Sequence, residues 1–150
     1  MADSLLFAGD HVLPTITPSI GFSFPAEPQP LFDFMASLTK VRGLPDLRIL
    51  PAHGPVAPSS HARVDELTVF HEKRLEGSLA ALAAGPLSSA QVACHLGWTR
   101  HEHAYDELDV FSRGMAAMET KAHLELLVAR DQATRSEDAD GVVTFAAADM

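Results

Sequence analysis

The 150-residue sequence lacks features that mark several classes of protein. It has one cysteine, Cys94, so no internal disulfide can form and a reducing cytoplasm is the expected location. It has no run of about 18 apolar residues, which argues against a membrane-spanning helix. Residues 1–4 carry no basic side chain ahead of the first apolar run and so do not resemble a signal peptide. Basic residues are scarce: 11 Lys and Arg against 20 Asp and Glu give a net charge of −9, which disfavours non-specific binding to nucleic acid.

Two short apolar runs are present, and each is followed by a potential metal ligand. Leu5–Ala8 is followed by Gly9 and Asp10, and Leu47–Leu50 is followed by Pro51, Ala52 and His53. The segment between the runs has helical spacing, so we expect one β-α-β unit with parallel strands and a right-handed crossover. Parallel strands end at the same edge of a sheet, where ligands gather in open α/β sheets, so Asp10 and His53 are expected side by side. Because Leu5–Ala8 is continuously apolar, its strand is expected to be buried on both faces.

A long proline-rich segment, residues 11–30, follows the first run. It has no periodicity, and a loop of this length inside a compact domain is usually a lid or a binding loop. Its hydroxyl and apolar side chains could form a wall of an active-site cleft. A linker that covers a sheet edge explains the same composition, and the sequence leaves both interpretations open.

The second half of the chain is mainly helical. An apolar stripe from Val64 to about Ala84 predicts a helix capped by Ser59 or Ser60, which Gly85-Pro86 ends. Ser88–Gln91 has the form of a capping box and opens a short helix that should finish at Gly97. A longer helix is expected over residues 108–126, and residues 133–136 and 142–145 predict a β-hairpin with Asp140-Gly141 at its turn. Three helices followed by a hairpin is the order of elements in a winged helix.

Three segments resemble one family: Leu5–Leu13, the Pro51–Gly54 turn and Glu119–Leu124. They are similar to the metallo-β-lactamase-fold hydrolases with a C-terminal winged-helix domain, the group that contains the β-lactamase-like 2 endoribonuclease. The resemblance implies an αββα sandwich with two metal ions, normally zinc, at its edge. It implies that Asp10 bridges both ions and that His53 ligates the second, since carboxylate and neutral imidazole suit zinc. A metal-bound water would then attack an ester, thioester, lactone, lactam or phosphodiester.

The chain departs from this family in its main metal motif. The family's His-x-His-x-Asp-His sequence precedes the Gly-Asp strand, and here it occurs nowhere; the only His-x-His is His101-Glu102-His103. Asp10 and His53 alone fall short of the three or four protein ligands that one zinc usually takes. We therefore expect a C-terminal fragment of such a hydrolase, with weak or absent zinc binding and no catalytic residues or turnover of its own. Its substrate-binding residues are unknown.

The remaining candidate residues have structural interpretations. His11 should point away from Asp10 and hydrogen-bond the loop. His101 and His103 are expected to be solvated loop residues, and His123 a buried histidine with a hydrogen-bond partner. Cys94 is expected to be a small buried side chain rather than a nucleophile.

The predicted fold class is α+β. Residues 1–60 form the C-terminal part of a metallo-β-lactamase-like domain, a truncated αββα half with one β-α-β unit. Residues 61–150 form a winged-helix domain with a leading linker helix. The alternative function is a non-catalytic winged-helix module that binds proteins. DNA is not an expected partner, because residues 85–150 contain five basic and eleven acidic side chains. For the intact family, an ester or thioester substrate is expected before RNA, and a homodimer is left open.

Overall fold

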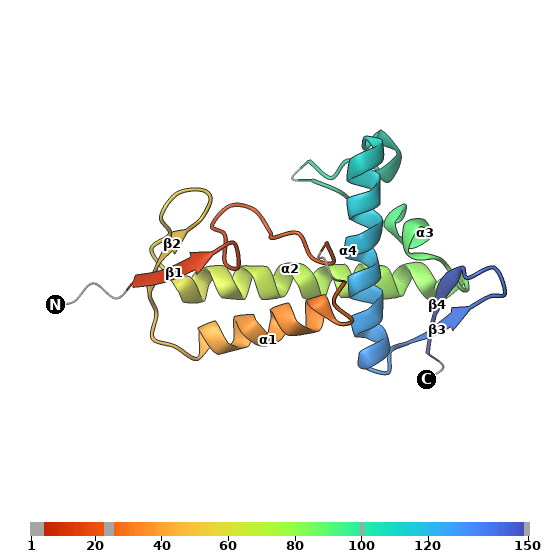
Figure 1. Cartoon of the computed structure of the whole chain (residues 1–150), viewed down its shortest axis with the longest axis horizontal. Coiled ribbons are helices and arrows are strands. Elements are labelled where there is room, and N and C mark those ends of the chain that lie inside the picture. The colour runs from red at the N-terminus through yellow and green to blue at the C-terminus, as the bar shows by residue number, and fades with distance from the viewer. Residues whose placement is uncertain (1–4, 23–25, 100, 149–150) are drawn as a thin grey trace. The chain divides into compact units, whose positions relative to one another are not determined.

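The computed structural model describes residues 5–22, 26–99 and 101–148, and Figure 1 shows its elements. They are β1 (Leu5–Gly9), α1 (Pro30–Arg42), β2 (Arg48–Pro51), α2 (Ser60–Ala81), the 3-10 helix η1 (Leu82–Ala84), α3 (Ser89–Ala93), the 3-10 helix η2 (Tyr105–Glu107), α4 (Val110–Ala129), β3 (Ala133–Glu137) and β4 (Val143–Ala147). The chain divides into two compact units. The first unit comprises the described residues through Pro18 with Phe32–His71, and the second comprises Ser19–Leu31 with the described residues from Glu72 onward. Among the described helices, none is both long and apolar enough to cross a membrane.

The first unit contains the expected β-α-β arrangement. Strands β1 and β2 are parallel, with Leu6 paired to Ile49, and α1 lies between them in the sequence. Helix α1 begins with Pro30, whose fixed φ suits a first helical position, and Lys40 and Arg42 lie in its last turn, where cations favour the helix dipole. The buried side chains of this unit include Leu38, Ile49, Val64 and Leu67. The prediction of a parallel pair joined by a helix is confirmed.

Strand β1 is not buried on both faces as predicted. Phe7 is 80% exposed and Leu5 is 37% exposed, while Leu6 and Ala8 on the opposite face are partly covered. The physical reason is that, among the described residues, no second strand pairs with the other edge of β1 and no element covers the face that carries Leu5 and Phe7. A continuous apolar run predicted a strand correctly but not how much of it is covered.

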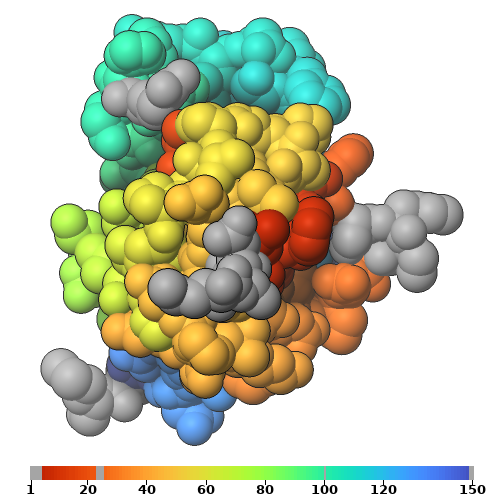
Figure 2. Space-filling view, turned by 90° about the vertical axis from the view of Figure 1, so that its left-hand side faces the viewer, coloured from red at the N-terminus to blue at the C-terminus, as the bar shows by residue number. Residues whose placement is uncertain are grey.

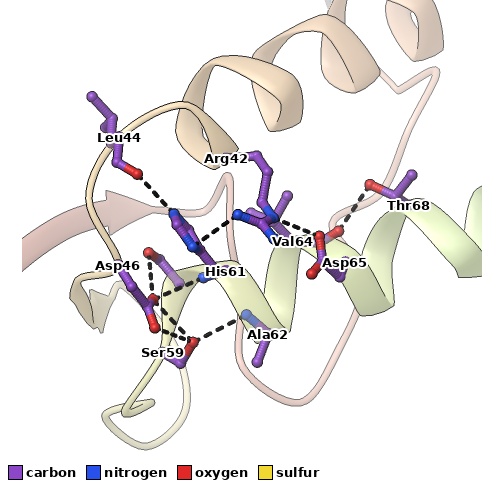
Figure 3. A network of polar contacts seen from close by, with 10 residues as sticks. Arg42, Leu44, Asp46, Ser59, His61, Ala62, Val64, Asp65 and Thr68 are labelled. Carbon is purple, nitrogen blue, oxygen red and sulfur yellow. Dashed lines mark hydrogen bonds and ion pairs between the residues drawn. The ribbon is translucent and has the colours of Figure 1, made fainter.

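A network of polar contacts joins the end of α1 to the start of α2 (Figure 3). Ser59 is the residue that caps α2, because its Oγ accepts a hydrogen bond from the backbone N–H of Ala62 at 3.1 Å. Asp46 accepts from the hydroxyl of Ser59 at 2.8 Å and from the backbone N–H of His61 at 3.1 Å. These hydrogen bonds lower the pKa of Asp46, the bond from His61 most of all. The network therefore fixes the turn that leads into β2.

The second unit agrees closely with its predicted elements. Ser88 caps α3 through the predicted capping box, since its hydroxyl accepts from the N–H of Gln91 and the Gln91 side chain accepts from the N–H of Ser88. Strands β3 and β4 form an antiparallel hairpin, and the buried Phe145 of β4 pairs with Leu87. Helix α3 packs against α4. The described elements from α3 onward are mixed helix and hairpin, as the sequence predicted.

Two details of this unit differ from the predictions. Helix α3 ends at Ala93 and not at Gly97. Cys94, predicted to be buried, is exposed, and its thiol donates to the carbonyl of Ala90 at 3.3 Å. Val92 and Ala93 fill the buried positions next to it, so the cysteine falls on the solvent side of the helix end. The division into domains at residues 60 and 61 stays a prediction.

Candidate functional site

Asp10 and His53 lie together at the carboxyl ends of the two parallel strands. Asp10 Oδ1 is 3.3 Å from His53 Nε2, and the two side chains are 71% and 70% exposed. The backbone around Asp10 turns sharply, because Gly9 adopts a left-handed φ of 54° and the N–H of His11 donates to the carbonyl of Ala8. The N–H of Ala52 donates to the carbonyl of Gly9 at 2.9 Å, which continues the pairing up to the site. The sequence reasoning located this pair through strand topology.

The turn that carries His53 is packed against the start of the long loop. Gly54 has a φ of 90°, and a Cβ there would lie 3.0 Å from Cγ of Pro14. A side chain at residue 54 would therefore meet both an unfavourable backbone conformation and Pro14. The guanidinium of Arg63 on α2 donates to the carbonyls of Leu13 at 2.6 Å and Ile16 at 3.0 Å. The first part of the loop is thus held beside the Asp10–His53 pair.

Asp10 and His53 could supply two of the ligands of a zinc ion, but they do not form a complete zinc site. Two ligand atoms about 2.0–2.1 Å from one tetrahedral zinc lie about 3.3 Å apart, which matches the separation of Asp10 and His53. Carboxylate oxygen and imidazole nitrogen are both zinc ligands. Within the part of the chain that the structure describes, however, no group of three or more His, Cys, Asp or Glu side chains is placed to hold a metal ion. Asp10 and His53 are therefore the right kinds of side chain for zinc, but two ligands are too few for a zinc site.

The imidazole of His11, which was predicted to hydrogen-bond the loop, lies against Phe34 of α1. Its ring centroid lies 5.0 Å from that of Phe34, and Nε2 is buried without a hydrogen-bond partner among the described residues. Burial lowers the pKa of His11, which favours the neutral ring. The ring therefore packs against Phe34, and Nε2 does not make the predicted hydrogen bond to the loop.

The other predicted histidines lie where the sequence placed them. His101 and His103 are exposed, and His103 Nδ1 is 3.1 Å from Glu107 Oε2. Glu107 also accepts from the N–H of Ala104, and the two contacts, the backbone one first, lower its pKa. His123 is 1% exposed, its Nδ1 lies 2.8 Å from the carbonyl of Glu119, and burial lowers its pKa to about 4. It is a buried, neutral histidine with a partner.

Sequence reasoning missed a buried cation in the second unit. The guanidinium of Arg74 lies 4.2 Å from the ring centroid of Trp98, donates to the carbonyl of Gly97 at 3.1 Å and lies 3.7 Å from Glu119 Oε1. Burial lowers the pKa of Arg74 and raises that of Glu119. The indole N–H of Trp98 donates to the carbonyl of Ala93 at 2.9 Å. In the sequence, the single tryptophan was the one sign of this arrangement. Its contacts hold residues 93–98 in place and involve neither of the predicted metal ligands, Asp10 and His53.

About half of this chain matches a known family model, and nearly all of it matches solved structures. Residues 75–148 match the family model of the metallo-beta-lactamase-like, C-terminal domain. The chain is similar to a beta-lactamase domain protein from Burkholderia ambifaria, with 32% identity and a TM-score of 0.82 over 98% of this chain and 42% of that one. It is also similar to a metallo-beta-lactamase family protein from Thermus thermophilus, with 27% identity and a TM-score of 0.76 over 97% of this chain and 42% of that one. No curated protein matches.

The extent of these similarities defines what they support. The chain spans 42% of the length of each of the two similar structures. The family model covers α4 and the β3–β4 hairpin, and the structural similarity covers nearly the whole chain, including the strands that carry Asp10 and His53. The similarities support a metallo-beta-lactamase fold, with residues 75–148 corresponding to that family's C-terminal domain.

Proposed function

We propose that this chain corresponds to the C-terminal part of a zinc-dependent hydrolase of the metallo-β-lactamase type, in which Asp10 and His53 are metal ligands. The observation that carries the proposal is the 3.3 Å separation of these two donors at the carboxyl edge of the parallel strands. The resemblance of the Gly9-Asp10 strand end and the Pro51–Gly54 turn to the family's metal-binding segments supports the same assignment.

The two side chains would contribute differently to a metal centre. The carboxylate of Asp10 has two oxygens and can therefore bridge two cations, whereas the neutral ring of His53 can bind one. In an intact site, a bound zinc would lower the pKa of a water molecule, which is the chemistry needed for ester, thioester, lactone or phosphodiester hydrolysis. The Arg63 contacts to Leu13 and Ile16 would keep the adjoining loop beside the reacting groups. The strongly acidic composition favours an ester or thioester over RNA, and one cysteine suits a reducing cytoplasm.

For this chain by itself, we propose weak zinc binding and no turnover. Two protein ligands leave the remaining positions on the ion to water, so affinity should be far below that of a three- or four-ligand site. Titration of the full chain with zinc chloride, followed by NMR of the imidazole resonances, tests this. The His53 signals should move at high micromolar to millimolar zinc, on the order of the affinity of a two-ligand site.

Matched variants make this experiment decisive. Asp10→Asn should reduce the response of His53 to zinc, while His101→Gln removes an exposed histidine elsewhere and should leave the response unchanged. Zinc-induced shifts confined to His101 and His103 would show that the ligand assignment is wrong. Tight retention of zinc through dialysis would contradict the expected weak binding.

The second candidate function is a non-catalytic winged-helix module that binds another protein. It is supported by the order of elements, in which three helices, α2, α3 and α4, precede the β3–β4 hairpin. DNA is an unfavourable ligand because residues 85–150 carry a net charge of −6, from five basic and eleven acidic side chains. Nanomolar binding of duplex DNA at physiological salt, measured by electrophoretic shift, would refute the exclusion of DNA.

A further inference from the structure

Arg63 on α2 joins two carbonyl groups of the loop that follows β1. Its Nε donates to the carbonyl of Leu13 at 2.6 Å, and its Nη2 donates to that of Ile16 at 3.0 Å. The side chain is 15% exposed, and its Nη1 forms an ion pair at 2.8 Å with Glu66 on the same helix. The planar guanidinium can hold two acceptors in a fixed relation, which the ammonium group of a lysine cannot do.

These two hydrogen bonds are the main polar restraint on this part of the loop. Within the described residues, no backbone group of residues 12–18 hydrogen-bonds another backbone group. Leu13 is 3% exposed, whereas Ile16 is 48% exposed, so apolar burial fixes the loop at the first acceptor but not at the second. Arg63 therefore fixes the course of the two residues that lie between its acceptors.

The two residues between the acceptors, Pro14 and Thr15, lie against the turn that carries His53. A Cβ on Gly54 would lie 3.0 Å from Cγ of Pro14 and 3.5 Å from Oγ1 of Thr15. Figure 2 shows this end of the chain, where the connection from β2 to α2, in yellow, lies beside the segment around β1, in red. Glycine adopts many backbone conformations, so contacts with neighbours decide which one the turn takes.

His53 depends on this turn for its position beside Asp10. The last backbone hydrogen bond between the strands reaches Ala52, one residue before the histidine. The side chain of His53 is 70% exposed, and an exposed ion pair is too weak to hold two segments of chain together. The backbone of the turn is therefore fixed by contacts outside the pair, and Pro14 supplies them on the side of the loop.

We propose that Arg63 is a positioning residue for His53, which it keeps beside Asp10 by holding Pro14 against Gly54. The proposal rests on the proposed function for the role of the two side chains as metal ligands. Groups that orient a metal ligand change metal affinity by about 10–100-fold when they are removed. The effect of Arg63 on zinc should be near the lower end of this range, because it acts through the loop.

NMR of the full chain without zinc tests the positional effect first. Wild type should show nuclear Overhauser effects between the His53 ring and the Asp10 side chain. Arg63→Met keeps the apolar stem of the side chain but removes its donors, and it should lose these effects. Glu66→Ala is the matched control, because it removes the ion pair to the same guanidinium and should keep them. Circular dichroism checks that each variant is folded.

A lysine variant keeps the test independent of the methionine variant. Arg63→Lys retains the charge and can donate to one of the two carbonyls, so it should lose part of the contact between His53 and Asp10. A lysine variant with the complete wild-type contact would show that the fork of the guanidinium is not required, and would overturn the proposal.

A double variant tests whether Arg63 acts through Pro14. Pro14→Ala removes the ring atoms that face Gly54, and it should itself weaken the contact between His53 and Asp10. Combined with Arg63→Met, it should cause no further loss, because two residues that act through one contact are not additive. Additive losses would overturn the route through Pro14.

Titration with zinc chloride separates this proposal from the proposed function. Arg63→Met should need about tenfold more zinc than wild type to shift the His53 resonances. A wild-type His53 that does not respond to zinc would contradict the metal role, while the zinc-free contacts still decide whether Arg63 positions the ring. Wild-type ring contacts in Arg63→Met would overturn the proposal, as would their loss in Glu66→Ala. So would equal zinc responses of wild type and Arg63→Met.

Discussion

The two units differ in how their polar groups are supported. In the first unit, the Asp10–His53 pair is about 70% exposed and lies at the end of a two-stranded sheet, in which the Leu5 and Phe7 face of β1 is exposed. In the second unit, Arg74 and Glu119 are 13% and 18% exposed and are held against Trp98, whose indole is itself hydrogen-bonded. Exposed pairs contribute little to stability, whereas breaking a buried pair leaves a charge without its partner. The comparison indicates that buried contacts hold the polar groups of the second unit, whereas the Asp10–His53 pair of the first unit has little protection from solvent.

The largest expected effect comes from removing the buried cation. Arg74→Ala should lower the free energy of unfolding by about 3–5 kcal/mol, because Glu119 would lose its cation and Trp98 its packing partner. Arg135→Ala is the control: its ion pairs with Glu125 and Glu137 involve an arginine side chain that is 38% exposed, and the expected loss is about 0.5 kcal/mol or less. Urea denaturation followed by circular dichroism measures both. Equal losses of unfolding free energy in the two variants would mean that burial does not make Arg74 more important for stability than Arg135.

The next effect is a pH dependence that belongs to the second unit. The pKa of His123 is lowered to about 4 in the folded chain from its ordinary value of 6.5, mainly by burial. The unfolded chain therefore binds the additional proton between these values, so stability should decrease by about 2–3 kcal/mol as the pH falls from 6.5 to 4. Glu119, whose pKa is raised by burial, opposes part of this loss, since its protonation favours the folded chain.

A histidine variant separates the two contributions. His123→Gln should have a smaller stability difference between pH 6.5 and pH 4 than wild type, measured by urea denaturation at each pH. Thr120→Val, a buried neighbour on α4 that does not titrate, should shift stability equally at both values. If the glutamine variant keeps the full pH dependence, the titrating group is not His123.

A third prediction compares the units directly by native-state hydrogen exchange. Amides of β1 and β2 should open with a free energy at least about 1.4 kcal/mol lower than those of residues 105–128, which corresponds to about tenfold lower protection. The reason is that β1 and β2 form an isolated, partly uncovered pair, whereas α4 packs against α3. Equal protection in the two ranges would remove the contrast between the units.

The smallest expected effects come from two helix caps, one in each unit. Ser59→Ala and Ser88→Ala should each cost about 1 kcal/mol, because each removes an acceptor for a backbone N–H at the start of a helix. Hydrogen exchange should show faster opening mainly of residues 43–65 in the first variant and of residues 87–96 in the second. Faster opening across the whole chain in both variants would show that the units unfold as one.

The sequence was most informative where local chemistry determines structure. Ser88 and Gln91 predicted a capping box, Asp140-Gly141 predicted a hairpin, and the spacing of two apolar runs predicted the parallel strands that bring Asp10 to His53. Each of these follows from residues close in sequence or from the handedness of one connection.

Sequence reasoning failed where distant contacts decide. The exposure of Phe7 depends on whether another element covers its face of β1, and the burial of Arg74 depends on residues 24 and 45 positions away, Trp98 and Glu119. The Asp46 network likewise joins residues about fifteen positions apart through hydrogen bonds that have no periodicity. Cys94 was predicted to be buried, but α3 ends at the preceding residue, Ala93, and the cysteine is exposed. No pattern of residue types encodes these arrangements.

The contact between Arg74 and Trp98 also has a spectroscopic consequence. Trp98 is the only tryptophan of the chain, is 8% exposed and lies wholly within the second unit. Intrinsic fluorescence excited at the indole band will therefore follow the melting of one unit and be silent toward events at Asp10, His53 or β1. If the unfolding curve followed by tryptophan fluorescence has a steeper slope or a higher midpoint than the curve followed by amide absorption, the two units unfold in separate transitions. This comparison needs no added label.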